Sequence, residues 1–475
     1  MTIHEALSAV LSQRSQNQAI FEYTPDVGPR VISFSQLGDE VVGLSQEFTG
    51  WGIGKRHKVA FFLENSIEFI ESFLAILAIR AVPVIVQLDF RKLELEEIFS
   101  NAQPEAVISE DFHLDILRPY LGNRLVIGRR NHRFYRIQNG SDRSTCAEFP
   151  EETASINYTY RGYGYPLGAL APHAQYLNGA NCFQKCVQFQ RGGSLLSILP
   201  FSHMFSLVGC ILLSLLFGIR IIISRSLSPR SIFNIIREQR INYLISVPDI
   251  LLMLSRSIDP EMSFPSLQTM VSGGSLLRLE DQLCIEQAFG AELLNGYGLT
   301  EFTPITGNVR GQSKKGTIGC PSASLEVRIE SENTGRIGEI CLRTEDMARS
   351  YYRRAKETSE AVRDSWFLTG DLGYFDDSHL VFAREKKETR KVHGNMVDLN
   401  EVRRAIALID PTLEVKVDCI DGLLLARLGI PSTVVFEQKV AEIRRNLRQS
   451  IASYKIPGKF YRLDECPPGG STTCP

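Results

Sequence analysis

Short apolar runs alternate with segments of helical periodicity along most of this chain. Lys58 to Leu63 and Val82 to Gln87 are compact apolar runs, typical of buried strands. Between them, Phe69 to Ile79 repeats apolar residues at the spacing of one helix face. The same alternation returns at 219–224 and 231–242. This pattern predicts an α/β protein with large, mostly parallel sheets that are covered by helices.

The length of the chain and one run of charge predict two domains. A chain of 475 residues exceeds the roughly 250–300 residues beyond which a single core stops growing. The dense charges from Arg384 to Lys391 are typical of a solvated connector, which places a boundary near residue 386. We therefore expect a large N-terminal domain of covered mixed sheets at 1–386. A small, shortened α+β lid domain follows at 387–475, with an amphipathic helix from about Glu437 to Tyr454.

Composition excludes several classes of partner. With 52 basic and 54 acidic residues, the formal net charge is −2, which predicts neither nucleic-acid binding nor attraction to an anionic membrane. The most apolar run, Leu207 to Ile223, is interrupted by Arg220 and is shorter than the ~20 residues of a membrane span. The first residues lack the basic start and apolar stretch of a leader peptide. The ten cysteines show no metal-ligand spacing, which favours reduced thiols in a cytoplasmic protein.

Four segments occur in a fixed order and carry a resemblance that covers nearly the whole chain. They read Leu199-Pro-Phe-Ser-His-Met-Phe205, Asn295-Gly-Tyr-Gly-Leu-Thr-Glu301, Trp366-Phe-Leu-Thr-Gly-Asp371 and Gly394-Asn-Met-Val-Asp-Leu-Asn-Glu401. Together they resemble the adenylate-forming superfamily of acyl-CoA synthetases, luciferases and peptide-synthetase adenylation domains. One such motif is a weak signal, whereas the ordered set is specific.

The resemblance assigns nucleotide contacts to two segments. It implies that Tyr297 packs against adenine, that Thr300 contacts the α-phosphate and that Glu301 helps to hold Mg²⁺, a hard cation that prefers oxygen ligands. The residues around them, Asn295 and Gly298, belong to the same loop. The alternative for this loop is a strand-to-helix turn in which Thr300 and Glu301 only cap a helix. A glycine-rich strand end that lies along adenine is implied for Ser272, Gly273 and Gly274, although such a segment is also an ordinary turn signal.

Three further residues each match one functional position of the family. Asp371 corresponds to the carboxylate that accepts the ribose hydroxyls. Arg384 stands where the family has an arginine on the ribose side, although a lone arginine is commonly a surface charge. His203 matches a histidine at the mouth of the carboxylate pocket, and its alternative is a core histidine with no ligand.

The segment that should wrap the terminal phosphates of ATP departs from the family pattern. It reads Tyr158-Thr-Tyr-Arg-Gly-Tyr-Gly-Tyr-Pro-Leu-Gly168, so that Tyr160, Gly162 and Tyr163 replace small hydroxyl residues and Leu167 replaces a lysine. Each lost charged hydrogen bond removes about 1.5–3 kcal/mol of binding. Arg161 could restore one positive charge, and the tyrosine hydroxyls could donate to phosphate.

The C-terminal region departs as well. The family places a catalytic lysine where this chain has Thr473, and the hinge fits only with an inserted residue, which leaves Glu388 as its uncertain pivot. Both this departure and that of the phosphate loop weaken the formation of an acyl adenylate from ATP. The contacts to the nucleoside monophosphate are retained.

Two hypotheses of different classes follow. In the first, the protein is an acid–thiol ligase that converts a carboxylic acid and ATP, with Mg²⁺, to an acyl adenylate and passes the acyl group to coenzyme A or to the phosphopantetheine of a carrier protein. In the second, it is an adenylation-deficient homologue that acts as an acyl or thioester transferase or as a scaffold for an acyl carrier protein. A nucleotide sensor or structural subunit is a minor variant of the second. The partners expected are a small carboxylic acid or acyl thioester, and no nucleic acid.

Overall fold

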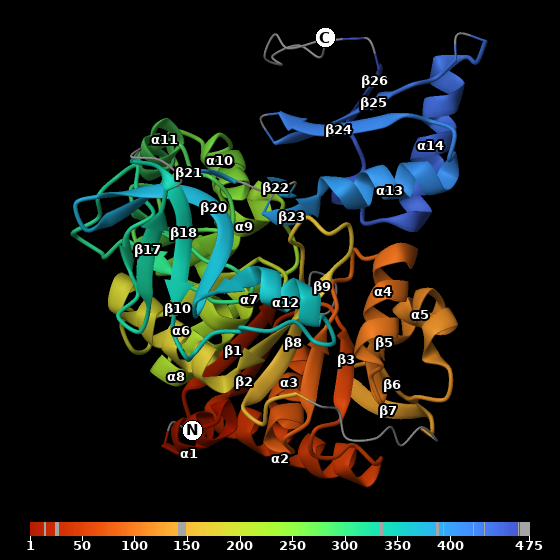
Figure 1. Cartoon of the computed structure of the whole chain (residues 1–475). Coiled ribbons are helices and arrows are strands. Elements are labelled where there is room, and N and C mark those ends of the chain that lie inside the picture. The colour runs from red at the N-terminus through yellow and green to blue at the C-terminus, as the bar shows by residue number, and fades with distance from the viewer. Residues whose placement is uncertain are drawn as a thin grey trace.

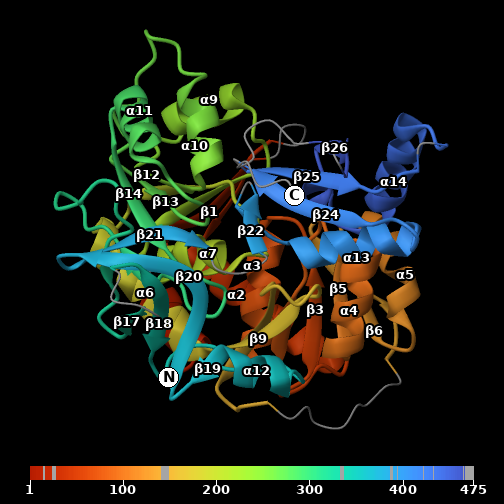
Figure 2. The ribbon, with the colours of Figure 1, turned by 45° about the horizontal axis from the view of Figure 1, so that its top comes forward.

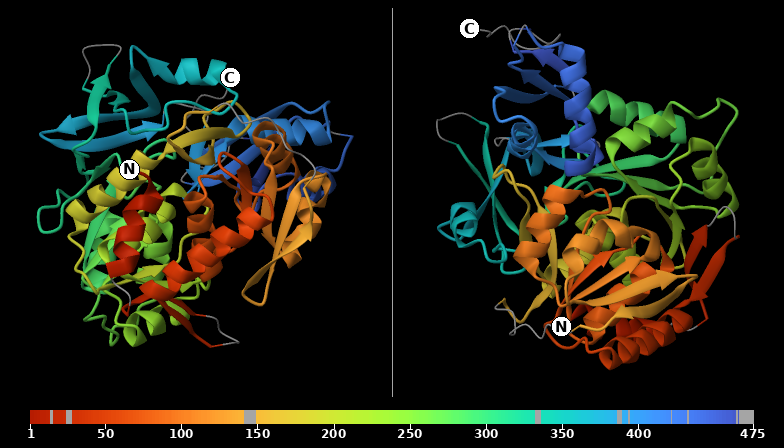
Figure 3. Two further views of the ribbon diagram at one scale, coloured as in Figure 1. Left: turned by 90° about the horizontal axis from the view of Figure 1, so that it is seen from below. Right: turned by 90° about the vertical axis from the view of Figure 1, so that its right-hand side faces the viewer.

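The computed structural model describes residues 1–475 except 14–15, 24–27, 141–148, 332–335, 386–388, 393, 421, 432, 464 and 466–475. Two large sheets with helices around them form the body of the molecule, and a C-terminal part stands on one end of it (Figure 1). The views in Figure 3 place this part opposite α1 (Ile3–Gln13) and α2 (Phe34–Gly50).

The first sheet has seven strands in the order β7-β6-β5-β3-β4-β8-β9. Its inner strands are parallel, and antiparallel strands close both edges. Its strands are β3 (Lys58–Phe62), β4 (Val82–Ile85), β5 (Ala106–Glu110), β6 (Leu125–Arg130), β7 (Arg133–Gln138), β8 (Thr153–Thr159) and β9 (Leu167–Pro172).

The second sheet has nine strands in the order β16-β15-β14-β13-β12-β10-β11-β1-β2. The strands from β14 to β1 run parallel, as expected for βα units. Its strands are β1 (Gln18–Tyr23), β2 (Arg30–Ser33), β10 (Ser194–Ser197), β11 (Arg220–Ser224), β12 (Tyr243–Ser246), β13 (Thr269–Ser272), β14 (Glu292–Tyr297), β15 (Thr306–Gly307) and β16 (Cys320–Pro321).

One apolar core joins the two sheets through buried helices. Its residues come from strands of both sheets and from α2, α3 (Ile67–Ala78) and α6 (His173–Val187). Helix α3 begins where the Ser66 side chain accepts the Phe69 N–H, and its residues from Ile67 to Leu77 are all buried. The remaining helical segments of this body are α4 (Lys92–Ala102), the 3₁₀ turn Asp111–His113, α5 (Leu114–Leu121), α7 (Met204–Ser206), the π-helical turn Leu207–Leu212, α8 (Leu213–Phe217), α9 (Pro229–Glu238), α10 (Pro248–Ser255) and α11 (Leu279–Phe289).

A smaller antiparallel sheet lies beside the second sheet (Figure 2). Its order is β17-β18-β20-β19, and β21 pairs with β20. Its elements are β17 (Glu326–Glu330), β18 (Gly338–Arg343), α12 (Ala355–Ala361), β19 (Val362–Arg363), β20 (Trp366–Asp376) and β21 (His379–Glu385).

The C-terminal part has a core of its own, with residues that run from Val392 to Ile451. Helix α13 (Leu399–Ile409) starts at Asp398, whose side chain accepts the N–H groups of the first turn. The other elements are β22 (Thr389–Val392), β23 (Asn395–Asp398), β24 (Val415–Ile420), β25 (Leu423–Leu428), α14 (Phe436–Ser450), the 3₁₀ turn Ser453–Lys455 and β26 (Lys459–Arg462).

The predicted fold class is confirmed: covered mixed sheets are followed by a small α+β part. The helix expected from Phe69 lies at α3, and the apolar run from Leu207 forms short helical segments that lead into β11. In the described part of the chain, no helix is both long and apolar enough to cross a membrane. The boundary near residue 386 stays a prediction, since 386–388 lie outside the described residues.

Candidate functional site

A cavity of about 300 Å³ opens where several parallel strands of the nine-stranded sheet end. The residues that follow β10, β13 and β14 line it, together with the β22–β23 hairpin of the C-terminal part. In open α/β sheets, ligands bind beyond the carboxyl ends of the strands, so this position by itself marks a binding site.

The end of β13 presents its backbone to the cavity. Ser272, Gly273 and Gly274 all line it. A Cβ on Gly273 would lie 3.2 Å from the Phe205 ring, and Gly274 has a φ of +83°, which favours glycine. Both glycines leave the backbone here without side chains, so a ligand can approach it closely.

The segment after β14 supplies an aromatic wall and a tight turn. Asn295, Tyr297, Gly298 and Thr300 line the cavity. A Cβ on Gly298 would stand 2.5 Å from Thr303 Oγ1, so the turn has no room for a side chain. These four positions are where the sequence placed the adenine and α-phosphate contacts.

Tyr297 connects this wall to the neighbouring sheet. Its hydroxyl donates a hydrogen bond to Asp371 Oδ2 over 2.6 Å, and both side chains are buried. Burial and the Asp371 carboxylate raise the pKa of Tyr297 well above its usual value. Asp371 thus lies at the hydroxyl end of the ring that was predicted to face adenine, and it is not among the described residues that line the cavity. Arg384, one strand away in β21, is exposed and is not among the described residues that line the cavity.

His203 lies on the cavity wall after β10, half-buried. Burial lowers the pKa of His203 to about 4, although a side-chain hydrogen bond with Asn395, which favours the protonated ring, opposes this shift. The imidazole is therefore neutral at physiological pH and offers a hydrogen bond to a ligand, not a charge.

The C-terminal part closes the cavity with residues to which the sequence analysis assigned no ligand contact. Lys391, Asn395, Met396 and Tyr454 line it. The Lys391 ammonium lies 5.6 Å from the centre of the Tyr297 ring, so a positive charge stands beside the aromatic wall. The run from Arg384 to Lys391 suggested a solvated connector, and periodicity alone gave no signal that its last lysine faces a cavity.

Side chains of the C-terminal part form hydrogen bonds with the loop that was expected to hold phosphates. Tyr160 donates its hydroxyl proton to Glu401 Oε1 over 2.8 Å. The fully buried Lys455 donates to the Tyr160 hydroxyl (2.7 Å), to Glu401 Oε2 (2.7 Å) and to Glu94 Oε1 (2.9 Å). In addition, the Gly164 N–H donates to Asp398 Oδ2 over 2.7 Å. The loop therefore binds the protein's own side chains.

Two further tyrosines of this loop are also bound by carboxylates. The Tyr163 hydroxyl donates to Glu360 over 2.6 Å, and the Tyr165 hydroxyl donates to Glu357, both on α12. Leu167, in the place of the family lysine, is fully buried in the core beneath. The tyrosine hydroxyls that could have replaced the lost phosphate ligands thus already donate hydrogen bonds to carboxylates of the protein.

Arg161 and Glu301 form a buried pair. Arg161 Nη1 lies 3.4 Å from Glu301 Oε1, and the same oxygen accepts the Tyr351 hydroxyl. Neither member of this pair is among the described residues that line the cavity. The structure therefore separates Glu301 and Arg161 from the predicted nucleotide contacts.

The residues present do not fit Mg²⁺ at Glu301. Mg²⁺ requires about six oxygen ligands in a near-octahedral arrangement. The Glu301 Oε1 atom already accepts two donors, one of them positively charged. No group of three or more His, Cys, Asp or Glu side chains in the described part of the chain is placed to hold a metal ion.

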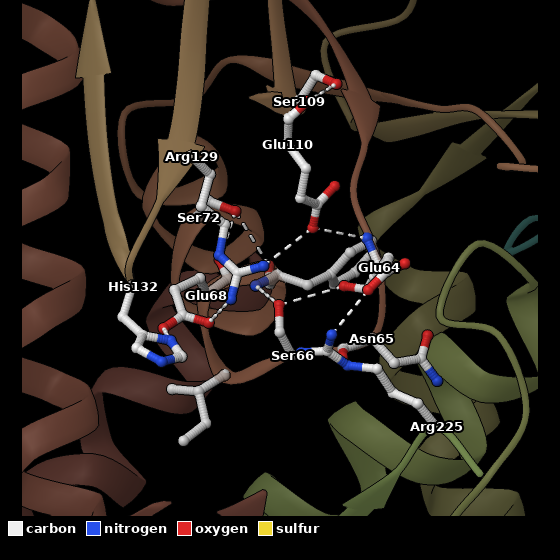
Figure 4. Close-up of polar contacts among 12 residues, drawn as sticks. Glu64, Asn65, Ser66, Glu68, Ser72, Ser109, Glu110, Arg129, His132 and Arg225 are labelled. Atoms are coloured by element: carbon white, nitrogen blue, oxygen red, sulfur yellow. Dashed lines mark hydrogen bonds and ion pairs between the residues drawn. The ribbon is translucent and has the colours of Figure 1, made fainter. Parts of the chain in front are cut away.

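A second charged cluster lies between the two large sheets (Figure 4). Arg129 donates to Glu68 Oε2 over 2.5 Å and to Glu110 Oε1 over 3.0 Å. Arg225, which follows β11 of the other sheet, donates to Glu64 over 2.7 Å. The Arg225–Glu64 pair links the two sheets, the Arg129 pairs lie within the first sheet and its helix α3, and none of these residues is among the described residues that line the cavity.

Comparisons with known proteins find CoA ligases that are similar to this chain. The chain is 24% identical over 460 residues to the 2-succinylbenzoate–CoA ligase of Bacillus mycoides, across 93% of this chain and 91% of that protein. It is 26% identical over 334 residues to the long-chain-fatty-acid–CoA ligase of Bacillus subtilis; this match covers 66% of the chain but only 59% of the relative.

Two solved structures share the fold. An o-succinylbenzoate CoA synthetase from Bacillus subtilis superposes with a TM-score of 0.81 at 18% identity, over 97% of this chain and 95% of that one. The amide bond synthetase of Marinactinospora thermotolerans superposes with a TM-score of 0.84, also at 18% identity, over 98% and 96%. The model of a family described as AMP-binding enzyme matches residues 9–352. The chain therefore belongs to the family of AMP-binding enzymes.

Proposed function

We propose that this protein works as an acid–thiol ligase of its family, handling a carboxylic acid as acyl adenylate and passing the acyl group to the thiol of coenzyme A. The observation that carries the proposal is one cavity whose wall combines the predicted nucleotide contacts, such as Tyr297, with His203 and Lys391. The relatives named above are CoA ligases, for a long-chain fatty acid and for 2-succinylbenzoate.

The thioester-forming half of this reaction has the clearest support. In it, the thiol sulfur attacks the acyl carbon of the adenylate, a C–S bond forms, the C–O bond to the phosphate breaks, and AMP and a proton leave. Lys391 would offset the charge on the departing phosphate, and the Thr300 hydroxyl would donate a hydrogen bond to it. The neutral imidazole of His203 would orient the acyl carbonyl by a hydrogen bond.

The nucleoside monophosphate fits the cavity wall better than a triphosphate does. The backbone of Ser272 to Gly274 and the Tyr297 ring offer two faces for adenine. Asp371 supports the Tyr297 ring through the hydrogen bond that it accepts from the Tyr297 hydroxyl. The loop beyond the α-phosphate contact presents carboxylates and engaged hydroxyls in place of phosphate ligands. For this reason, we assign no step to magnesium or to the terminal phosphates.

Synthetic acyl adenylates test the proposal without knowledge of the acid. The purified protein is mixed with coenzyme A and a panel of aryl and fatty acyl adenylates, and acyl-CoA and AMP are measured by mass spectrometry. We expect both products to form together with at least one adenylate, and the Tyr297→Ala variant to be at least tenfold slower. The matched control is Phe112→Ala, which removes an aromatic ring that is 67% exposed. No thioester from any adenylate would count against the proposal.

A second candidate is an adenylation-deficient homologue that transfers acyl thioesters or binds an acyl carrier protein as a scaffold. The occupied loop around Tyr160 favours it, since ATP-dependent adenylation needs that loop for phosphate. A carrier protein would present phosphopantetheine to the same cavity that admits the thiol of coenzyme A. AMP release from a supplied acyl adenylate in the presence of coenzyme A separates the candidates, because a thioester transferase or a scaffold consumes no adenylate. Both candidates imply a compartment with reduced thiols, and we propose the cytoplasm.

A further inference from the structure

Arg161 lies in the interior of the protein as an immobilised cation. Its side chain is 4% exposed, and its Cζ lies 4.7 Å from the centre of the Phe367 ring. Nη2 donates to the Leu368 carbonyl oxygen, and Nη1 faces Glu301 Oε1 at 3.4 Å. Burial lowers the pKa of Arg161, but the Tyr351 hydroxyl and the Glu301 carboxylate raise it by more, so the guanidinium stays charged.

Glu301 has its charge balanced by this arginine. The Glu301 side chain is 2% exposed, and its Oε1 accepts both Arg161 and the Tyr351 hydroxyl. A divalent ion bound here would have to displace or lie beside a positive group that aromatic and carbonyl contacts hold in place. Repulsion between the two cations in a buried environment opposes such binding.

Resting on the function proposed above, we propose that the Arg161 guanidinium permanently takes the place of a divalent cation at Glu301, so that the site receives a nucleoside monophosphate or its acyl ester and not a magnesium-bound triphosphate. A fixed monovalent cation supplies the charge that holds Glu301 in position. It cannot bridge the oxygens of a triphosphate, which is the task that requires a metal ion.

The surrounding loop supports the same ligand class. Tyr160 and Tyr163 donate to Glu401 and Glu360, and the Gly164 N–H donates to Asp398. A β- or γ-phosphate in this region would meet three carboxylates. The monophosphate part of a nucleotide, next to Thr300, stays on the cavity wall and avoids them.

Calorimetric titration of the intact protein with AMP and with ATP, each in excess Mg²⁺ and in EDTA, tests the inference. We expect AMP to bind with the same dissociation constant, within about twofold, in both solutions. We expect ATP to bind no more tightly than AMP in either. A gain of tenfold or more in ATP affinity on addition of Mg²⁺ would overturn the inference while leaving the proposed function intact. Failure of AMP to bind in both solutions would instead overturn the proposed function and this inference with it.

A charge-removing variant gives an independent measurement. Arg161→Gln keeps a polar group near the Leu368 carbonyl but removes the positive charge from Glu301. We expect this variant to bind Mn²⁺, detected by the loss of the free-ion signal in electron paramagnetic resonance, at least tenfold more tightly than the wild-type protein. The matched control, Arg363→Gln, removes a guanidinium that is 62% exposed and should leave Mn²⁺ binding unchanged. Tight Mn²⁺ binding by the wild-type protein that Glu301→Gln abolishes would overturn the inference. This wild-type comparison holds even where Arg161→Gln does not fold.

Discussion

Asp398 accepts a hydrogen bond from the backbone N–H of Gly164, a residue 234 positions earlier in the chain, over 2.7 Å. The same carboxylate starts α13 by accepting the N–H groups of Asn400 and Glu401. Burial raises the pKa of Asp398, against these backbone hydrogen bonds, which lower it. One side chain of the C-terminal part thus fills a position where the family's loop would receive phosphate. Lys455 and Glu401 extend this junction, so the loop and the C-terminal part form one buried polar interface.

Lys455→Met should destabilise the protein strongly. The substitution leaves Glu94 and Glu401 buried without the ammonium between them, and loss of one member of a buried charge cluster costs about 3–5 kcal/mol. The free energy of unfolding from urea titration measures the effect. Lys92→Met is the matched control, because the Lys92 side chain is 67% exposed and its Nζ lies 3.9 Å from Glu96 Oε1. This substitution should change the free energy of unfolding by under ~1 kcal/mol. A loss below ~1 kcal/mol for Lys455→Met would show that this charge cluster does not contribute substantially to the free energy of unfolding.

Lys391→Met should weaken the binding of AMP and spare that of adenosine. The Lys391 ammonium lines the cavity beside Tyr297, and a charged hydrogen bond to phosphate is worth about 1.5–3 kcal/mol, or roughly a 10- to 150-fold change in the dissociation constant. Calorimetry with both ligands measures the difference. Lys416→Met removes a lysine that is 53% exposed and should leave both affinities unchanged. An equal loss for AMP and adenosine would place the effect of Lys391 on the base or the fold, not on the phosphate.

Gly298→Ala should lower both stability and AMP affinity. The added Cβ would lie 2.5 Å from Thr303 Oγ1, so the turn that carries Thr300 must shift, at a cost of about 1–3 kcal/mol. Thermal unfolding and AMP titration report the two effects. Gly43→Ala adds the same methyl group inside α2, with no atom within 4 Å, and should stabilise the helix by ~0.5–1 kcal/mol. Unchanged stability in Gly298→Ala would contradict the tight packing described here.

Glu71 should make stability fall as pH rises. Burial, then the Glu68 and Glu40 carboxylates, raise the pKa of Glu71 from 4.5 to about 8, although Arg30 and Arg129 oppose them. Between these two values, the folded state holds a proton that the unfolded state releases. The free energy of unfolding therefore declines with rising pH in this window, by at most ~1.4 kcal/mol per pH unit from this group.

The measurement for Glu71 is urea unfolding at several pH values across that window. Glu71→Gln should flatten the decline, because the amide does not titrate. Glu345→Gln, at a side chain that is 91% exposed, should keep the slope of the wild-type protein. Parallel slopes for wild type and Glu71→Gln would show that this carboxyl titrates normally in the folded state.

The sequence predicted the features that depend on neighbouring residues, namely helices, strands and short motifs. The helix expected from Phe69 appeared because its apolar residues repeat on one face and Ser66 caps its start. The ordered motifs correctly predicted the family. Ser272, Tyr297 and His203 line one cavity, and their roles in ligand binding stay predictions. Each of these residues lies at or after the end of a strand, and the carboxyl ends of parallel strands meet at one edge of the sheet. Their common position therefore follows from the order of strands and turns along the chain.

Pairings between distant segments could not be predicted in this way. The sequence offered Arg161 as a residue that could restore charge to the phosphate loop, and the structure pairs it with Glu301, 140 residues further along the chain. Lys455, 295 residues from Tyr160, carried no local signal beyond its place in a short turn. Such contacts depend on how two sheets and the C-terminal part pack, which periodicity and spacing do not contain.

The Gly164 amide proton is a reporter of motion between the C-terminal part and the body. It is buried and bonded to Asp398, so it can exchange with solvent deuterium only when that contact opens. If the C-terminal part separates as a unit, the exchange rate of this single amide will match that of Ala452, whose N–H is bonded to Glu94. The free energy of separating the two parts can thus be read from two backbone protons, with no ligand present.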